Sequence, residues 1–244
     1  MSTWADGPMV AFDLETTGPD PETARIVTAS TVHIHPGDQP STYDVLVNPG
    51  IDIPAEATAV HGVTTEQARE HGVDPVEVVR WLSAYLADLA EAGTPIVIYN
   101  APFDLGVLDR ECRRHGVPTL HERCATEGLS LFIVDPLTLD RALDQYRRGS
   151  RKLVDVARHY GVALSEEDAH TSSGDCLAAA RVAWKIARAY PVVGEMDRDA
   201  LMAYQAAKYS AWAAGFEQYL TRQGKPEPIA REWPIRAHAA VANV

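Results

Sequence analysis

Two acidic residues, Asp13 and Glu15, directly follow the short apolar run Met9–Phe12, which is typical of a buried strand. Residues two apart on a strand leave the same face, so both carboxylates are expected on one side of a sheet. At about 4 Å, two like charges repel by about 4 kcal/mol at an effective dielectric constant of 20. Folding tolerates such a pair if a cation lies between the carboxylates or if one of them stays protonated. Oxygen ligands without cysteine or histidine favour Mg²⁺ or Mn²⁺ over Zn²⁺, so the pair indicates such a site.

The same Asp-x-Glu spacing occurs twice more, in different settings. Asp20 and Glu22 lie in a proline-containing turn, where solvated carboxylates are expected. Asp109 and Glu111 lie inside an expected helix, where residues two apart do not share a face. Only the pair that begins at Asp13 follows an apolar run that would bury it, so this pair is the candidate.

A second acidic element lies where a later strand is expected to meet a helix. The apolar run Ile96–Tyr99 predicts a strand that ends at Asn100, and Pro102 suits the first turn of a helix. Asp104 is then expected in or near that turn, where the helix dipole favours a carboxylate. Two interpretations stay open here: a metal ligand, or an Asn100 cap followed by a first-turn acid that needs no metal.

The third element combines an acid with a histidine. Asp175 follows serines that can cap a helix and precedes an apolar helix, so it too is expected in a first turn. His170 lies in the loop just ahead, and its unperturbed pKa of about 6.5 lets it exchange protons near neutrality. The plainer alternative is a surface histidine beside a helix-capping aspartate.

The three elements occur in an order that can bring them to one edge of a sheet. An acid pair lies on a first central strand, an acid opens the helix after the fourth strand, and a His/Asp pair opens a late helix. Four carboxylates and one base are what a two-metal phosphodiester hydrolase requires.

The elements that would position these residues form a mixed sheet covered by helices on both faces. Strands come first and strand–helix alternation follows, which is the pattern of an α/β fold. The first three strands are expected to form an antiparallel meander. The predicted strands are 9–15, 25–35, 42–47, 95–99 and 131–134. The predicted helices are 74–93, 102–115, 138–146, 153–160 and 173–190.

The last fifth of the chain differs from the rest, and we divide the chain into a domain at 1–191 and a helical appendage at 192–244. Residues 191–194 look like a linker. One long helix is predicted for Asp197–Gln223, followed by an irregular tail. One side of this helix is expected to be apolar and to pack on the core or on a partner. Its residues are Leu201, Tyr204, Trp212, Phe216 and Tyr219.

The composition is that of an acidic globular protein. The 244 residues include 22 Lys and Arg against 34 Asp and Glu, a net charge of −12, and 46% are hydrophobic. This balance excludes wholesale disorder, and it excludes a global basic field that would hold nucleic acid. A polyanionic substrate must therefore meet metal ions or a local basic patch. The best such patch is Arg147–Lys152, with a solvated loop as the alternative.

The sequence favours a cytoplasmic protein with no membrane partner. No apolar run approaches the roughly 18–20 residues of a membrane span, and the N-terminal residues lack the basic start and apolar core of a signal peptide. Cys112, Cys124 and Cys176 cannot all pair and lack metal-ligand spacing. Small buried thiols in a reducing compartment are therefore expected.

The chain resembles the DEDDh (DnaQ-like) 3′→5′ exonucleases, the family of the epsilon proofreading subunit of bacterial DNA polymerase III, over roughly residues 8–190. Phe12–Gly18 is similar to the first exonuclease motif, Tyr99–Asp104 to the second, and His170 with Asp175 to the third. Val60–Thr64 resembles the family's segment beside the 3′-terminal nucleotide. Two further stretches that resemble the family are 135–137 and 152–157.

The resemblance implies an RNase H-like fold, a five-stranded mixed sheet flanked by helices. It implies that four carboxylates bind two Mg²⁺ or Mn²⁺ ions, namely Asp13, Glu15, Asp104 and Asp175. It makes His170 the general base that takes a proton from the attacking water, with nucleoside 5′-monophosphates as products. A sister subclass has tyrosine four residues before the last aspartate; position 171 is threonine, so the histidine subclass fits.

The resemblance also implies a pocket for the 3′-terminal sugar and base. Its residues are Thr16, Val60, His61, Asn100 and Phe103. Phe103 offers a stacking face that tolerates any base, and a place in the core of its own helix is the alternative.

Three functions stay open. The first is a metal-dependent 3′→5′ exonuclease on the 3′ ends of single-stranded DNA, in proofreading or repair. The second is an exoribonuclease or short-oligonucleotide hydrolase of the same fold, because discrimination of the 2′-hydroxyl depends on pocket geometry. The third is a non-catalytic module that docks a replication or repair protein through residues 192–244. Loss of a ligand or of His170 would favour this third function, and all five residues are intact.

Overall fold

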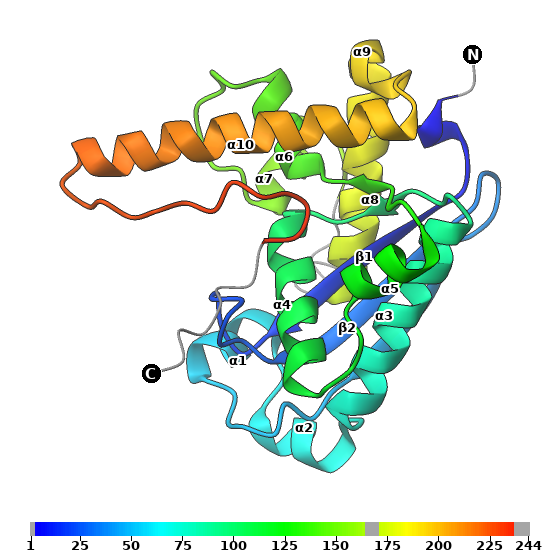
Figure 1. Ribbon diagram of the computed structural model, residues 1–244, viewed down its shortest axis with the longest axis vertical. Helices are drawn as coiled ribbons and strands as arrows, with labels where there is room; N and C mark the ends of the chain where they lie inside the picture. Colours follow the sequence, from blue (N-terminus) through cyan, green and yellow to red (C-terminus); the bar gives the residue numbers. More distant parts are fainter. Residues whose placement is uncertain (1–2, 164–170, 237–244) are drawn as a thin grey trace.

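Five strands form one mixed sheet at the centre of the molecule (Figure 1). A computed structural model describes residues 3–163 and 171–236 of the chain. The strand order is β3-β2-β1-β4-β5, with antiparallel pairing of β1 with β2 and of β2 with β3, and parallel pairing of β4 with both β1 and β5. The strands are β1 (Met9–Thr16), β2 (Ile26–Ile34), β3 (Ser41–Leu46), β4 (Ile96–Val97) and β5 (Ile133–Val134). The mixed sheet and its antiparallel meander are confirmed.

Helices cover both faces of the sheet, and each face has its own hydrophobic cluster. The first face carries α3 (Pro75–Glu91), α4 (Ala101–Arg114) and α5 (Leu120–Glu127). The second face carries α6 (Pro136–Leu143), α7 (Leu153–His159) and α8 (Ser172–Ala189). Along β1, Phe12 and Leu14 pack in the first cluster, and Met9 and Ala11 in the second. The alternation of side chains therefore directs Asp13 toward the face that α8 covers.

Several short helices were not predicted from the sequence. These are η1 (Trp4–Asp6), α1 (Ala55–His61), α2 (Thr65–His71), α5 and α9 (Pro191–Gly194). The expectation of a linker at 191–194 is wrong, because these residues form a helical turn whose Val193 and Gly194 are buried. In the described part of the chain, no helix is both long and apolar enough to cross a membrane. Cys112, Cys124 and Cys176 are free and buried, as expected.

The long helix α10 (Arg198–Arg222) confirms the helix predicted for this segment. Four of its residues are buried at intervals of four, namely Leu201, Gln205, Tyr209 and Ala213. The Gln205 amide nitrogen donates to the Ile133 carbonyl (2.9 Å), and its oxygen accepts from the Asp135 amide (2.8 Å). Because β5 is an edge strand, these bonds satisfy backbone groups that the sheet leaves open.

The single apolar side expected for this helix is only partly correct. Leu201 is fully buried, whereas the side chains of Phe216 and Tyr219 are 37% and 49% exposed. The helix continues past the sheet toward its C-terminal end, so the later aromatic residues have no core to pack on (Figure 1).

After α10 the chain turns back and runs along the helix toward α4 (Figure 1). Trp233 of this returning segment is buried, and its indole nitrogen donates to the Asp135 carboxylate (3.3 Å). The carbonyl of Arg236 accepts a hydrogen bond from Arg110 on α4 (2.9 Å). The segment is thus anchored at two points on the elements that surround the end of β5.

Candidate active site

Three carboxylates meet at the C-terminal part of β1. Asp13, Glu15 and Asp175 each offer one oxygen, and these oxygens all lie within 4.8 Å of one another. Two come from β1, and the third comes from the first turn of α8. This arrangement brings together residues from the start and the end of the domain, as the sequence analysis expected.

The start of α8 is fixed by two hydroxyl contacts. Thr171 is the N-cap, and its side chain accepts from the Gly174 amide (3.1 Å). The hydroxyl of Ser172 lies 2.7 Å from the hydroxyl of Thr28 on β2. These bonds hold the first turn of α8, and with it Asp175, against the sheet.

Asp104 enters the same region from the opposite side. It is 3% exposed in the first turn of α4, and its Oδ1 accepts from the backbone amide of Leu14 (3.1 Å). Leu14 lies between Asp13 and Glu15, so this bond ties α4 to the acid pair itself. Among the described residues, the compact group of possible metal ligands does not include Asp104, which adjoins that group through this bond.

The carboxylates of the site repel one another, and burial together with this repulsion raises the pKa values of Asp13 and Glu15. Burial, followed by the charges of Asp104, Glu15 and Asp175, raises the pKa of Asp13 well above its usual value. Burial, and then Asp175, raises the pKa of Glu15 to about 7. Burial also raises the pKa of Asp104 well above its usual value, although the Leu14 amide opposes this. A cation among these oxygens would reverse the repulsion.

The backbone before Asp104 is unusual. Asn100 is the N-cap of α4 in the left-handed region (φ 68°), and it is the only non-glycine residue with positive φ in the described ranges. Its amide donates to Oδ1 of Asp135 (3.0 Å), and its side chain makes no capping bond to α4. The interpretation of Asn100 as an ordinary side-chain cap is therefore wrong.

Asp135 is a residue whose role the sequence analysis missed. It is 1% exposed, and its carboxylate accepts from the amides of Asn100, Leu137 and Thr138, from the Thr138 hydroxyl and from Trp233. An Asp-Pro pair after a short apolar strand is a signal for a helix N-cap, and Asp135 does cap α6. The bond to Asn100 and the burial of Trp233 depend on tertiary contacts that no local pattern shows.

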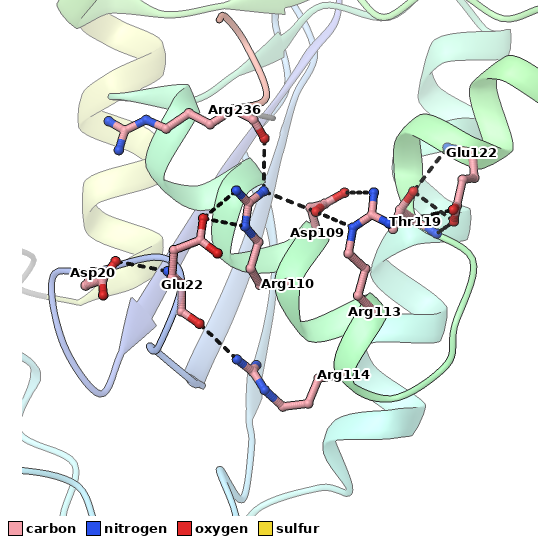
Figure 2. Close-up of polar contacts among 9 residues, drawn as sticks. All are labelled: Asp20, Glu22, Asp109, Arg110, Arg113, Arg114, Thr119, Glu122 and Arg236. Carbon is pink, nitrogen blue, oxygen red and sulfur yellow. Dashed lines mark hydrogen bonds and ion pairs between the residues drawn. The ribbon is translucent and has the colours of Figure 1, made fainter. Parts of the chain in front are cut away.

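Arg110 holds α4 to the turn that follows β1 (Figure 2). Its side chain is 3% exposed and donates to Glu22 of that turn (Nη2–Oε1 2.5 Å) and to the Arg236 carbonyl. Figure 2 also shows Asp109 accepting from Arg110 (3.1 Å) and Arg113 (2.8 Å). The two further Asp-x-Glu pairs contribute to this ion-pair network rather than to the metal candidate, because Glu111 instead pairs with Arg25 and Arg114.

A pocket of about 440 Å³ lies beside the carboxylates. Glu15 belongs to both the pocket and the acidic group, so the pocket opens onto the possible metal site. Four of the five predicted nucleotide-binding residues line it: Thr16, Val60, His61 and Phe103. Asn100 does not line it. Sequence analysis missed Pro54, Glu56 and Ala57 in the pocket wall, because α1 was not predicted.

The local structure explains how α1 presents its last two residues. The helix ends at His61, and Gly62 follows with φ 77°, a conformation that favours glycine. Nδ1 of His61 accepts from the Val63 amide (3.1 Å), so the neutral ring carries its proton on Nε2. Burial lowers the pKa of His61, and the Thr16 backbone opposes this shift. Nε2 is buried and has no partner with hydrogen-bond geometry among the described residues, although the Thr16 backbone lies near enough to act on the ring.

Phe103 is half-buried and packs against the first cluster while also lining the pocket. Packing of Phe103 on the core is thus observed, and its contact with a base stays a prediction. His170 lies outside the described residues; its neighbour Thr171 caps α8.

A family model named RNase_T and described as Exonuclease matches residues 10–183. The chain belongs to this exonuclease family. Every described residue of the acidic group lies inside the matched range, so the site belongs to the exonuclease domain. The resemblance to DnaQ-like 3′→5′ exonucleases is confirmed.

Relatives of this exonuclease domain are parts of longer proteins. The DNA polymerase III subunit epsilon-like protein of Rhodobacter capsulatus is 32% identical over 174 residues, which are 70% of this chain and 22% of that protein. The DNA polymerase III PolC-type protein of Streptococcus sanguinis is 27% identical over 180 residues, 73% of this chain and 11% of that protein. The chain thus spans between about a tenth and a fifth of these relatives.

Solved structures share the fold. Exonuclease I from Methylocaldum szegediense gives a TM-score of 0.60 at 22% identity and covers 76% of this chain and 41% of that one. E. coli exonuclease I, solved in complex with a dT13 oligonucleotide, gives 0.61 at 17% identity, over 77% of this chain and 43% of that one. The RNase H-like exonuclease fold expected from the sequence is confirmed.

Proposed function

We propose that this exonuclease domain removes nucleotides one at a time from the 3′ end of single-stranded DNA and releases nucleoside 5′-monophosphates. The observation that carries the proposal is the contact between the acidic group and the 440 Å³ pocket through Glu15. A terminal nucleotide in the pocket would place its 5′-phosphate beside the carboxylates. An internal nucleotide, with the nucleic acid chain on both sides, does not suit a pocket of about 440 Å³.

The residues fit a pair of divalent cations. Three carboxylate oxygens within 4.8 Å, with Asp104 adjoining them, form a hard donor set, and the raised pKa values of Asp13 and Glu15 favour a cation that would offset the repulsion. We propose that Asp13, Glu15, Asp104 and Asp175 hold two Mg²⁺ or Mn²⁺ ions, as in the DEDDh class. When bound, such ions supply the charge that acidifies a water and stabilises the leaving oxygen.

The chain's own residues would bind and orient the substrate. Phe103 offers its ring to the base, and His61 lines the same pocket and would contact the sugar. His170 is proposed, from its motif, as the base that takes the proton of the attacking water. The new bond joins that water's oxygen to phosphorus, the bond to the 3′-oxygen of the next nucleotide breaks, and this oxygen gains a proton.

DNA is favoured over RNA because E. coli exonuclease I, which shares the fold, was solved with dT13 and with dA16. The rates of digestion of DNA and RNA of one sequence distinguish this activity from that of an exoribonuclease. Docking of a replication or repair protein through 192–244 stays a proposal of the same kind.

The test uses 16-nucleotide DNA and RNA of one sequence, each labelled at the 5′ end in one sample and the 3′ end in another, with Mg²⁺ or Mn²⁺. We expect the 3′ label to appear at once as a mononucleotide and the 5′-labelled strand to shorten stepwise, faster for DNA. Internal fragments as first products would contradict the proposal, and faster digestion of RNA would favour the exoribonuclease. His170→Ala should stop release, whereas His71→Ala, on the exposed end of α2, should not.

A further inference from the structure

A second cavity, of about 650 Å³, lies between α10 and the end of α6 together with the segment that follows it. Its polar and aromatic lining includes Arg141, Arg147, Arg151, Lys208, Trp212 and Phe216. The arginines come from the exonuclease domain, and the other three residues come from α10, outside the range that the family model matches. We call this cavity the α10 groove.

The charge of the α10 groove is opposite to that of the whole protein. Four cations line it in a chain whose net charge is −12. Asp140 pairs with Arg147 (2.5 Å) and Arg151, and Asp144 lies 3.4 Å from Arg147. Within residues 3–163 and 171–236, no carboxylate lies within ion-pair distance of Arg141 or Lys208. Asp135 acts on Arg141 from beyond that distance. Four cations against these three carboxylates leave a local excess of one positive charge.

Flat rings continue from the α10 groove along the exposed end of the helix. The guanidinium of Arg141 lies 3.9 Å over the ring of Trp212. Trp212 and Phe216 are stacked with centroids 5.5 Å apart and planes within 10°, and Tyr219 continues the stack at 6.3 Å and 15°. Parallel rings beside cations suit bases and phosphates together.

The α10 groove lies at the same edge of the sheet as the acidic group. Because β1, β4 and β5 are parallel, their C-terminal ends share one edge. Tyr99, which follows β4, donates its hydroxyl to the carbonyl of Arg151 in the groove wall (2.6 Å). Two strand spacings, about 10 Å, separate β1 from β5 at this edge. A chain that leaves the 3′-nucleotide pocket can reach the groove without crossing the sheet.

We propose that the α10 groove binds the single-stranded nucleic acid upstream of the nucleotide being removed, with phosphates on Arg141 and Lys208 and bases against Phe216 and Tyr219. This inference rests on the proposed function, since it assigns a place to the rest of that substrate. An acidic peptide would satisfy the cations but would leave the stacked rings unused, so nucleic acid is the occupant that uses the whole surface.

The test measures binding without turnover. The full chain in EDTA is titrated into 5′-fluorescein-(dT)16, and anisotropy gives Kd at several salt concentrations. Without metal ions the acidic group repels the terminal phosphate, so the groove should dominate binding. The variant Lys208→Glu/Phe216→Ala should raise Kd about ten-fold or more and flatten the salt dependence. A matched control on α8, Lys185→Glu/Trp184→Ala, changes a cation beside an exposed ring by the same charge and should leave Kd within about two-fold.

A second measurement separates this inference from the proposed function. The ratio of kcat/KM for (dT)16 to that for the dinucleotide should fall in the groove variant and stay unchanged in the control. If both variants kept the Kd and the ratio of the parent chain, the proposed role of the α10 groove would be wrong. Nucleotide release by the parent chain would still support the exonuclease. Binding that depends on the groove, without any nucleotide release, would support the groove and contradict the exonuclease. Groove substitutions that weaken binding of a labelled octaglutamate peptide, but not of (dT)16, would also overturn the proposed role of the groove.

Discussion

At the scale of single residues, the site depends on carboxylates that repel one another. The carboxylate of Asp13 lies beside three other acids, and the charges of Asp104, Glu15 and Asp175 all raise its pKa. The free energy of folding is therefore less favourable than it would be with a neutral side chain at this position. Charged carboxylates favour cation binding but lower the stability of the fold, which is typical of a site that binds cations.

The variant Asp13→Asn should have opposite effects on activity and on stability. We expect the rate of nucleotide release to fall on the order of 10³-fold, because the substitution removes a negatively charged ligand of the proposed metal ions. The melting temperature of the metal-free variant should rise, since one repelling charge is removed. Asp88→Asn, an exposed acid on α3, serves as the control and should change neither quantity. A metal-free variant that melts below the parent chain would contradict the electrostatic part.

The pH dependence of stability should carry the signature of Glu15. Its pKa is raised from 4.5 to about 7 by burial and by Asp175, so between these values the folded state binds more protons than the unfolded state. The free energy of unfolding is then highest below about pH 4.5 with respect to this group, and it falls as the pH rises toward 7. After allowance for solvent screening, the loss is about 1–3 kcal/mol.

Urea unfolding in EDTA at pH 5 and pH 7.5 measures this loss, as the difference between the parent chain and Glu15→Gln. Addition of Mn²⁺ should restore the stability of the parent chain at pH 7.5 and restore less in the variant. The same pH dependence in both proteins would show that Glu15 titrates normally.

At the scale of elements, the position of Asp104 depends on how α4 begins. Asn100 turns the chain in a left-handed conformation, and Asp135 holds its amide. The same carboxylate binds Trp233, so the returning C-terminal segment contacts the group that sets the start of α4. Arg110 then holds the middle of α4 to the turn after β1 (Figure 2).

Asp135→Asn should therefore destabilise the protein by about 2–4 kcal/mol, because an amide nitrogen would face donors that now bind oxygen. Trp233→Phe removes only one of these bonds and should lower the free energy of unfolding by about 1 kcal/mol. Chemical denaturation gives both values, with Asp38→Asn in the exposed turn after β2 as the reference. Equal effects of Asp135→Asn and the reference would refute the central role of Asp135.

The sequence predicted the elements whose signals are local and strong. The apolar run before Asp13, the proline after Asn100 and the apolar repeat after Asp175 placed β1, α4 and α8 correctly. The helices α2 and α5 were missed although each begins with a capping box, Thr64 with Gln67 and Thr119 with Glu122. Their seven or eight residues carry little periodicity, so the cap was the one usable signal.

The strands β4 and β5 are shorter than predicted for a different reason. Only two residues of each apolar run pair in the ladder, and the chain then turns into α4 or α6. The partners of Asp135 and the interruption of the apolar side of α10 depend on contacts between distant segments. Because contacts between distant segments determine which side chains are buried, local sequence patterns cannot predict them.

At the scale of the whole molecule, α10 and the returning segment lie against the exonuclease domain. Leu201 belongs to one hydrophobic cluster, and Tyr209, Ala213 and Trp233 belong to the other. Gln205 completes the hydrogen bonds at the edge of β5. The exposed end of the helix supplies the rings of the α10 groove.

Deletion of residues 192–244 should for this reason expose apolar surface and leave little folded protein. We expect a melting temperature lower by more than about 10 °C, or aggregation on expression. A chain that ends at Arg236 keeps every described contact and serves as the control. A soluble, fully active chain that ends at position 191 would show instead that 192–244 is an independent appendage that serves a partner.

The most direct test of the carboxylate site is the rate of dTMP release from (dT)16 as Mn²⁺ is added to the EDTA-treated full chain, alongside Asp13→Asn. We predict no release without the metal, a saturable rise in the parent chain, and almost no release from the variant at any Mn²⁺ concentration. Release in excess EDTA, or an Asp13→Asn variant with the rate and Mn²⁺ dependence of the parent chain, would contradict the assignment of these acids to a catalytic metal centre.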